Sequence, residues 1–201
     1  MNANGSKDTN SKFTAFLDRD GVINEAIRGR WVNSVKDLKV YPYAAEAIRM
    51  LNEAGAEVIV ITNQSGVASG KLPHHEYYAI TAEMLRVLDQ DGAKITRVYE
   101  CLHSKNPVDC MCRKPDAGML YRAIEDYPTL LPRFLVGDCA SDIETAFRAL
   151  NASIKPIMVM TGLNNDDELT KTARLAERYG KEFWIEPDLL AACKMIVHSL
   201  S

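Results

Sequence analysis

The chain alternates between short apolar runs and longer segments in which apolar residues recur every three or four positions. Short runs predict strands, and Glu57–Thr62 is almost wholly β-branched, as is typical of a strand buried on both faces. Longer segments predict helices with one apolar face, such as Pro73–Asp91, which Gly92 follows. Six strands, each followed by a helix, predict a doubly wound parallel α/β sheet with helices on both faces.

The same pattern places each element along the chain. Expected strands are Phe13–Asp18, Glu57–Thr62, Thr96–Glu100, Arg133–Gly137, Lys155–Met160 and Glu182–Ile185. Expected helices are Pro42–Gly55, Pro73–Asp91, Asp116–Asp126, Ser141–Leu150, Asp166–Tyr179 and Asp188–Leu200, with Ser141 as the cap of its helix. Residues 1–12 are polar and lack periodicity, which predicts a mobile N-terminal arm. No repeat or linker divides residues 13–201, which we expect to form a single domain.

Composition and charge narrow the class of protein. Hydrophobic residues make up 47% and charged residues 25%, which is typical of a globular protein and excludes a disordered chain, a collagen or a coiled coil. The longest aliphatic stretches, Val58–Ile61 and Ile157–Met160, are too short to span a membrane, and no apolar segment follows Met1. The net charge of −3 disfavours sequence-independent nucleic-acid binding, which needs a basic patch. We expect a cytoplasmic monomer without a membrane or nucleic-acid partner.

Polar residues stand at the ends of four predicted strands: Asp18, Thr62, Cys101 and Asp138. The carboxyl ends of parallel strands meet at one edge of a sheet, and ligands bind there in open α/β folds. These four positions are therefore candidates for one functional site.

Two acidic segments at this edge suit phosphoryl chemistry. In Asp18-Arg19-Asp20-Gly21, one carboxylate can attack phosphorus, while the other can protonate the leaving oxygen and later deprotonate water. Taken alone, such a triplet is commonly a solvated turn. The second segment, Gly137–Asp142, adds Asp138, and the carboxylates of Asp18 and Asp138 can hold Mg²⁺ through oxygen ligands. A cation would also offset the repulsion between crowded carboxylates.

Two further segments carry groups that can bind phosphate oxygens. Thr62-Asn63-Gln64-Ser65-Gly66 offers a hydroxyl, two amides and backbone N–H groups, although a capped turn has the same composition. Arg113-Lys114-Pro115 places two cations ahead of a helix, a pattern that is also common on solvated surfaces. The candidate substrate-binding residues are thus Thr62, Asn63, Gln64, Ser65, Arg113 and Lys114.

Four soft metal ligands lie within one short segment, namely Cys101, His103, Cys110 and Cys112. Three thiolates and an imidazole suit tetrahedral Zn²⁺ in a closed structural site. Scattered thiols beside a surface histidine are the alternative interpretation. A structural zinc site would fix the loop that leads to the Arg113–Lys114 pair.

Taken in chain order, the acidic and phosphate-binding segments resemble the haloacid dehalogenase superfamily of phosphohydrolases. The order is Asp-x-Asp-Gly, Thr, Lys and Gly-Asp-x-x-x-Asp, and the likeness covers about residues 13–162. It implies a Rossmann-like fold of that superfamily's type and an aspartyl-phosphate intermediate, with Asp18 as nucleophile and Asp20 as general acid/base. It also implies that Thr62 and Lys114 hold the transferring phosphoryl group. The implied Mg²⁺ ligands are Asp18, the backbone carbonyl of Asp20 and Asp138, supported by Asp142.

The Cys/His loop and the run Cys112-Arg113-Lys114-Pro115 narrow the resemblance to the family of D-glycero-D-manno-heptose-1,7-bisphosphate 7-phosphatases. Its relatives that act on histidinol phosphate share the zinc loop. The resemblance implies a small phosphorylated sugar as substrate and a place in nucleotide-activated heptose biosynthesis. The alternatives are a histidinol-phosphate phosphatase, a nucleic-acid 3′-end phosphatase and a catalytically inactive, zinc-stabilised binding module. Every motif residue is present, which disfavours the last.

The gaps between the motifs are too short for a separate cap domain. A helix and a strand fill most of the gap that ends at Thr62, and a helix, a strand and the Cys/His loop fill the next one. Either loops then recognise the leaving group or an open cleft accepts large substrates. The loops best placed for recognition are Glu25–Asn33 and the Cys/His loop. Arg28, Arg30 and Arg113 can meet a second phosphate there, because a guanidinium pairs well with phosphate. For Arg28 and Arg30, solvated loop arginines are the alternative interpretation.

Overall fold

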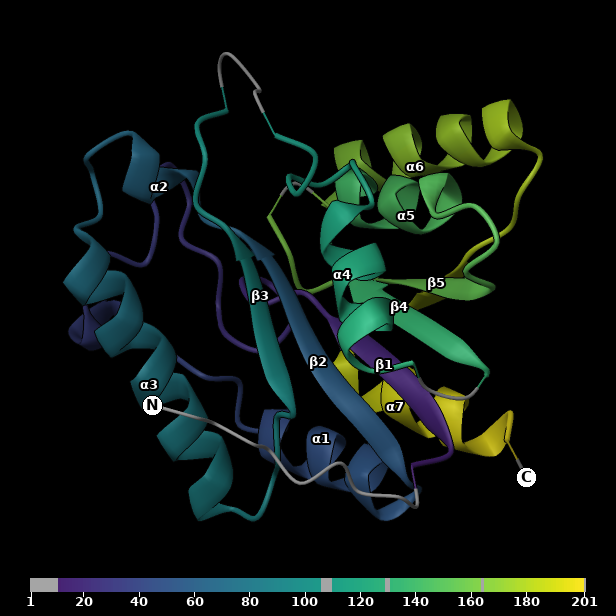
Figure 1. The fold of residues 1–201 in the computed structure, drawn as a ribbon, viewed down its shortest axis with the longest axis horizontal. Helices are drawn as coiled ribbons and strands as arrows, with labels where there is room; N and C mark the ends of the chain where they lie inside the picture. The colour runs from purple at the N-terminus through teal and green to yellow at the C-terminus, as the bar shows by residue number, and fades with distance from the viewer. Residues whose placement is uncertain (1–10, 106–109, 129–130, 164, 201) are drawn as a thin grey trace.

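The computed structural model describes residues 11–105, 110–128, 131–163 and 165–200. Within these residues, six strands form one parallel sheet in the order β3-β2-β1-β4-β5-β6 (Figure 1). The strands are β1 (Phe13–Leu17), β2 (Ala56–Asn63), β3 (Arg97–Cys101), β4 (Arg133–Gly137), β5 (Ile154–Val159) and β6 (Trp184–Glu186). The predicted parallel α/β sheet is confirmed. Residues 1–10 of the predicted arm lie outside the described residues.

Helices cover both faces of this sheet. They are α1 (Ala44–Glu53), α2 (Ser65–Ala68), α3 (His74–Gln90), α4 (Gly118–Asp126), α5 (Ala140–Arg148), α6 (Asn165–Tyr179) and α7 (Leu189–His198), with a 3₁₀ helix, η1, at Val35–Asp37. On one face α1, α3 and α7 share a core with Leu17 and Val60. On the other face α4 and α5 pack against Phe16 and Ile61, and α6 lies outside α5 (Figure 1). Adjacent strand residues thus point to opposite faces.

The helix ends largely follow their sequence signals. Gly55 and Gly92 follow the C-cap residues of α1 and α3 with φ of +92° and +76°, a conformation that glycine adopts without strain. The predicted cap at Ser141 is wrong, because α5 begins at Ala140 and its N-cap is Cys139. The Asp142 carboxylate accepts a hydrogen bond from the Cys139 backbone N–H at 3.0 Å and so fixes the helix start two residues earlier than a cap at Ser141 would.

The strand order brings the candidate residues together. Because β3, β2, β1 and β4 are neighbours, Cys101, Thr62, Asp18 and Asp138 reach the same carboxyl edge of the sheet. Between β1 and β2 the chain forms only loops, η1 and α1, so the described residues contain no separate cap domain over this edge. The site is therefore built from loops on a rigid parallel sheet.

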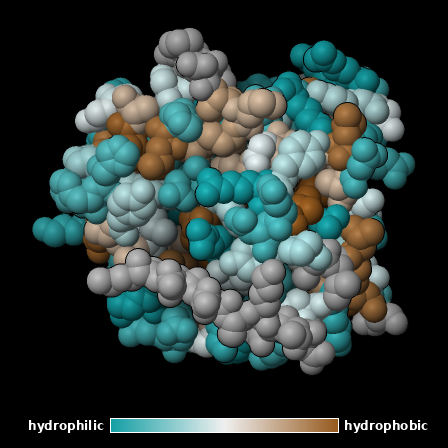
Figure 2. Space-filling model, viewed as in Figure 1, coloured by the Kyte–Doolittle hydropathy of each residue, from teal (hydrophilic) through white to brown (hydrophobic). Residues whose placement is uncertain are grey.

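Two observations concern the outer surface. Among the helices that the structure describes, none combines the length and the apolar character needed to cross a membrane. On the face shown in Figure 2, hydrophobic residues of the described segments occur in small groups among hydrophilic ones. Scattered groups of this kind are ordinary for a protein surface and need no partner to cover them.

Candidate active site

A buried lysine lies at the centre of the carboxyl edge. The Lys114 Nζ atom is 2.8 Å from an oxygen of Asp18 and 2.6 Å from an oxygen of Asp142. It also donates to the backbone carbonyl of Ile61 at 3.0 Å, so all three of its protons can be used. The Lys114 side chain is 2% exposed, and that of Asp142 is fully buried. The structure thus brings the predicted phosphate-binding lysine into contact with the predicted nucleophile.

The charges in this cluster shift one another's pKa values. Burial raises the pKa of Asp18 to about 6, with Lys114 opposing the shift and Asp142 adding to it. Burial and the charges of Asp142 and Asp18 raise the pKa of Asp138 well above its ordinary range. Burial would lower the pKa of Lys114, but the two carboxylates beside it raise that pKa overall. Lys114 therefore stays charged and is the only cation in the described residues that contacts Asp18 and Asp142.

The surroundings of Asp138 fit a further cation. Its carboxylate lies so close to the backbone of Gly21 and Gly162 that a Cβ atom at either glycine would collide with it. One Asp138 oxygen is buried and has no hydrogen-bond partner among the described residues. The carboxylates of Asp18 and Asp142 contact the Lys114 ammonium group, and Asp138 adds a third carboxylate close enough for its charge to interact with theirs. Hard oxygen donors with excess negative charge suit Mg²⁺.

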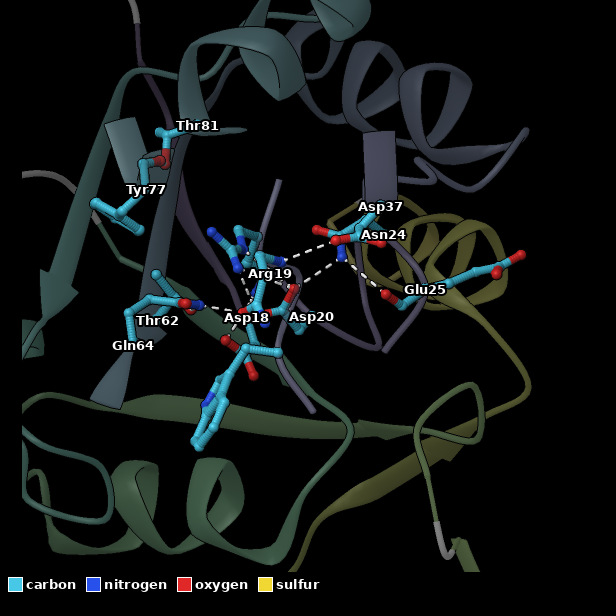
Figure 3. A network of polar contacts seen from close by, with 12 residues as sticks. Asp18, Arg19, Asp20, Asn24, Glu25, Asp37, Thr62, Gln64, Tyr77 and Thr81 are labelled. Carbon is cyan, nitrogen blue, oxygen red and sulfur yellow. Dashed lines mark hydrogen bonds and ion pairs between the residues drawn. The ribbon is translucent and has the colours of Figure 1, made fainter. Parts of the chain in front are cut away.

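Asp20, the second carboxylate of the first motif, is held by three side chains (Figure 3). Arg19 donates to both oxygens at 2.8–3.2 Å, and the amides of Asn24 and Gln64 each donate at 2.8 Å. Burial would raise the pKa of Asp20, but the Arg19 charge and these hydrogen bonds lower it overall. Asp20 is therefore ionised in this state and has the form of a base.

The Thr62–Ser65 segment differs in part from the sequence expectation. The Asn63 side chain makes two hydrogen bonds to the Lys114 backbone, both of 3.0 Å, and so fixes the lysine loop. Gln64 is fully buried, and its amide nitrogen donates to Asp20 and to the Thr62 hydroxyl. Ser65 is buried as the first residue of α2. The two amides expected to contact substrate are thus committed to other residues of the protein.

The four soft ligands come together as predicted. Cys101 Sγ is 3.6 Å from His103 Nδ1 and 3.7 Å from Cys110 Sγ, and His103 Nδ1 is 3.1 Å from Cys112 Sγ. One ligand atom from each of the four residues lies within 4.8 Å of all the others. Three sulfurs and one nitrogen at this spacing fit a tetrahedral Zn²⁺ site with no open position.

Serine in place of Cys110 is expected to remove the metal and loosen this loop. Because binding to a closed site contributes folding free energy, we expect zinc content to fall and the Tm to drop by about 5 °C or more. Elemental mass spectrometry and calorimetry measure the two effects. Met111→Ser is the matched control, since Met111 lies in the same loop and is 80% exposed. A zinc-free wild-type protein, or a Cys110→Ser protein with unchanged Tm, would contradict the site.

The three candidate arginines have different surroundings. Arg30 forms an exposed ion pair with Asp37 at 2.9 Å, so its guanidinium already has a partner. Arg28 is exposed. Arg113 is half-buried, and its Nη1 atom is buried without a hydrogen-bond partner among the described residues. Of the three, Arg113 therefore has the guanidinium best suited to receive an anion.

Sequence reasoning missed two residues of the site, Arg19 and Asn24. Arg19 is fully buried, pairs with Asp20 and lies 5.9 Å from the centre of the Tyr77 ring. Its position between two aspartates, directly after a buried strand, was the one available signal. Asn24 is also fully buried. No sequence pattern distinguished it from an ordinary turn residue.

Comparison with known proteins gives consistent matches. A sequence model of the family described as polynucleotide kinase 3 phosphatase matches residues 13–183. The D-glycero-beta-D-manno-heptose-1,7-bisphosphate 7-phosphatase of Rhodopseudomonas palustris is 42% identical over 139 residues, which cover 66% of this chain and 76% of that protein. The D-glycero-alpha-D-manno-heptose-1,7-bisphosphate 7-phosphatase of Photorhabdus laumondii is 33% identical over 142 residues, 67% of this chain and 76% of that one.

Solved structures give a similar result. The crystal structure of D,D-heptose 1,7-bisphosphate phosphatase from B. bronchiseptica, complexed with magnesium and phosphate, superposes with a TM-score of 0.79. The two sequences are 30% identical, and the match covers 92% of this chain and 98% of the other. The similarity therefore extends over nearly the whole of both chains.

Proposed function

Because this chain belongs to the polynucleotide kinase 3 phosphatase family, within the haloacid dehalogenase superfamily of phosphoric monoester hydrolases, we propose that it removes the 7-phosphate of D-glycero-D-manno-heptose 1,7-bisphosphate. The observation that carries this choice of substrate is the Arg113–Lys114 pair. Lys114 contacts Asp18, while Arg113 beside it keeps an unpaired, buried guanidinium nitrogen among the described residues. A bisphosphate has one phosphate group for Lys114, at the reacting position, and a second for Arg113.

In the proposed reaction Asp18 is the nucleophile. Its carboxylate oxygen forms a bond to phosphorus, the bond from phosphorus to the sugar oxygen breaks, and Asp20 gives its proton to that oxygen. Water then attacks the aspartyl-phosphate, Asp20 takes its proton, and phosphate leaves with Asp18 restored. Since the resting Asp20 is ionised, it must take up a proton before the first step.

The remaining residues hold the phosphoryl group. The Thr62 hydroxyl and the Lys114 ammonium group bind its oxygens, the ammonium group exchanging its contact with Asp18 for one with the phosphoryl group as Asp18 attacks. Lys114 then offsets charge that builds up in the transition state. Asp18, the backbone carbonyl of Asp20 and Asp138 would hold Mg²⁺, with Asp142 in support. When bound, the ion supplies further positive charge against the phosphoryl oxygens. We further propose a cytoplasmic monomer in which residues 13–201 form one domain, acting in nucleotide-activated heptose biosynthesis.

Two other enzymes remain as candidates. The description of the matching family favours a nucleic-acid 3′-end phosphatase, but the net charge of −3 provides no electrostatic attraction for a polyanion. Histidinol-phosphate phosphatase shares the zinc loop. Its substrate carries an amine where the bisphosphate carries a second dianion, and Arg113 would not attract that amine.

A comparison of substrates tests the proposal. We expect the highest kcat/KM with one of the two heptose bisphosphate anomers, compared with histidinol phosphate and a 3′-phosphorylated oligonucleotide. Arg113→Ala should reduce kcat/KM for the bisphosphate, because a charge-assisted pair with the second phosphate is lost. The expected loss of transition-state stabilisation is about 2–3 kcal/mol. The effect on nitrophenyl phosphate, which has no second phosphate, should be much smaller.

Lys105→Ala is the control for the loss of a cation, because Lys105 is exposed in the same loop. Equal losses on both substrates in Arg113→Ala would exclude Arg113 as the second phosphate site. Preferential turnover of histidinol phosphate or of the oligonucleotide would replace the proposed substrate.

A further inference from the structure

One amide nitrogen lies between two groups of the proposed chemistry. Gln64 Nε2 is 2.8 Å from an oxygen of Asp20 and 2.9 Å from the Thr62 hydroxyl oxygen. An amide nitrogen has two protons, and each is used by one of these acceptors. Gln64 and Thr62 lie on one side of the Asp18–Asp20 segment, and Asn24 lies on the other (Figure 3).

The contact determines how each neighbour can act. The Thr62 oxygen accepts the Gln64 proton, so the hydroxyl hydrogen of Thr62 is left to donate to a phosphoryl oxygen. On Asp20, Gln64 binds one oxygen while Asn24 binds the other, which fixes the plane of the carboxylate. Gln64 thus sets the direction of one donor and the orientation of one acid.

The backbone holds Gln64 rigidly in this place. Its N–H donates to the carbonyl of Cys101 at 2.8 Å, at the end of β3, and its carbonyl accepts from Val67 at 3.2 Å in the first turn after it. The side chain is completely buried. Both protons of its amide nitrogen are already donated to Asp20 and Thr62, which leaves none for a substrate and distinguishes Gln64 from a substrate-binding residue.

The other end of the amide is unpaired, so the side chain contributes through its nitrogen alone. Gln64 Oε1 is buried and has no hydrogen-bond partner among the described residues. An unpaired buried carbonyl destabilises a fold, and an apolar side chain of the same shape avoids that cost. The part of the amide that is matched to its surroundings is the nitrogen, and its two acceptors are the residues with roles in the proposed reaction.

We propose that Gln64 is a positioning residue that holds the general acid/base Asp20 and the phosphate-binding Thr62 in register with each other. This inference rests on the proposed function, which gives Asp20 and Thr62 those roles. Gln64 acts only through these two residues and does not touch the substrate. Its loss should therefore affect proton transfer to the leaving group more than binding of phosphate.

The test compares Gln64→Met with wild-type enzyme, zinc- and Mg²⁺-loaded, on two esters of similar shape. Phenyl phosphate has the poorer leaving group and needs the acid, so its kcat/KM should fall about 30-fold or more, whereas nitrophenyl phosphate should lose about threefold or less. The inhibition constant for inorganic phosphate should rise about threefold or less, because Lys114 and the Thr62 hydroxyl remain. The Tm should change little, because removal of the unpaired Gln64 oxygen offsets part of the loss of the contacts to Asp20 and Thr62.

Further variants separate the possible outcomes. Gln64→Asn keeps the amide, but its side chain is too short to reach both acceptors. Its kcat/KM should therefore fall more with phenyl phosphate than with nitrophenyl phosphate, as in Gln64→Met. It replaces Gln64→Met in the test if that variant does not fold. Asp20→Asn should discriminate more strongly. If it does not, the acid role in the proposed function is wrong. Two outcomes would overturn only the role of Gln64. In the first, Asp20→Asn discriminates between the esters but neither Gln64 variant does. In the second, a Gln64 variant loses affinity for inorganic phosphate in parallel with turnover.

Discussion

Asp18→Asn is expected to lower kcat by about 10⁴-fold or more, because an amide oxygen is not a competent nucleophile toward phosphorus. The fold should persist. One oxygen of Asp18 accepts from Lys114 at 2.8 Å and from the Arg19 backbone N–H at 2.7 Å, and an asparagine oxygen can accept both. Loss of activity at nearly unchanged Tm would therefore identify the carboxylate itself as essential.

Steady-state turnover of nitrophenyl phosphate and a calorimetric Tm provide the two measurements. Asp89→Asn makes the same chemical change at an exposed position of α3 and should leave kcat unaltered. Rapid-quench trapping of a phosphorylated protein should succeed with wild-type enzyme and fail with Asp18→Asn. A variant that keeps more than about a tenth of the wild-type kcat would mean that another group attacks phosphorus.

The sequence predicted the sheet and its functional edge well, because both depend on local pattern and simple topology. Arg133–Gly137 was predicted to the residue, and the other strands to within two residues at either end. Once parallel strands are expected, Asp18, Thr62 and Asp138 must reach one edge. The Cys/His cluster was also predictable, since its four ligands lie close together in the chain.

The contacts between motifs were not predictable, because they depend on how separate loops meet. Asn63 and Gln64 were expected to face the substrate, but Asn63 pairs with the Lys114 backbone and Gln64 with Asp20. Arg19 is fully buried, whereas a charged residue in a turn is expected to be solvated. The cost of burying Arg19 is offset by its contacts with both oxygens of Asp20 and with the Tyr77 ring.

The substitution Lys114→Met is expected to abolish activity and also to destabilise the fold, in contrast to Asp18→Asn. Among the described residues, the ammonium group is the only cation that contacts the partly buried Asp18 and the fully buried Asp142. Removing one partner of a buried ion pair leaves an uncompensated charge, which typically costs about 3–5 kcal/mol of unfolding free energy. Urea denaturation at neutral pH measures this loss, and a loss below about 1 kcal/mol would contradict the cluster as described.

The pH dependence and a second substitution distinguish lost charge compensation from lost packing. The pKa of Asp18 is about 6 in the folded protein, against an ordinary value of 3.8. Between pH 3.8 and pH 6, Asp18 therefore carries a proton in the folded state and has lost it in the unfolded state. Stability therefore rises as the pH falls through that window. Without Lys114 the pKa of Asp18 should rise further, so the loss of stability in Lys114→Met should shrink on acidification.

A second substitution, Asp142→Asn, removes a charge but can still accept from the Cys139 N–H. Added to Lys114→Met, it should restore much of the stability at neutral pH and none of the activity. A deficit that is independent of pH, and unaffected by Asp142→Asn, would instead indicate that Lys114 stabilises the fold through the packing of its aliphatic chain.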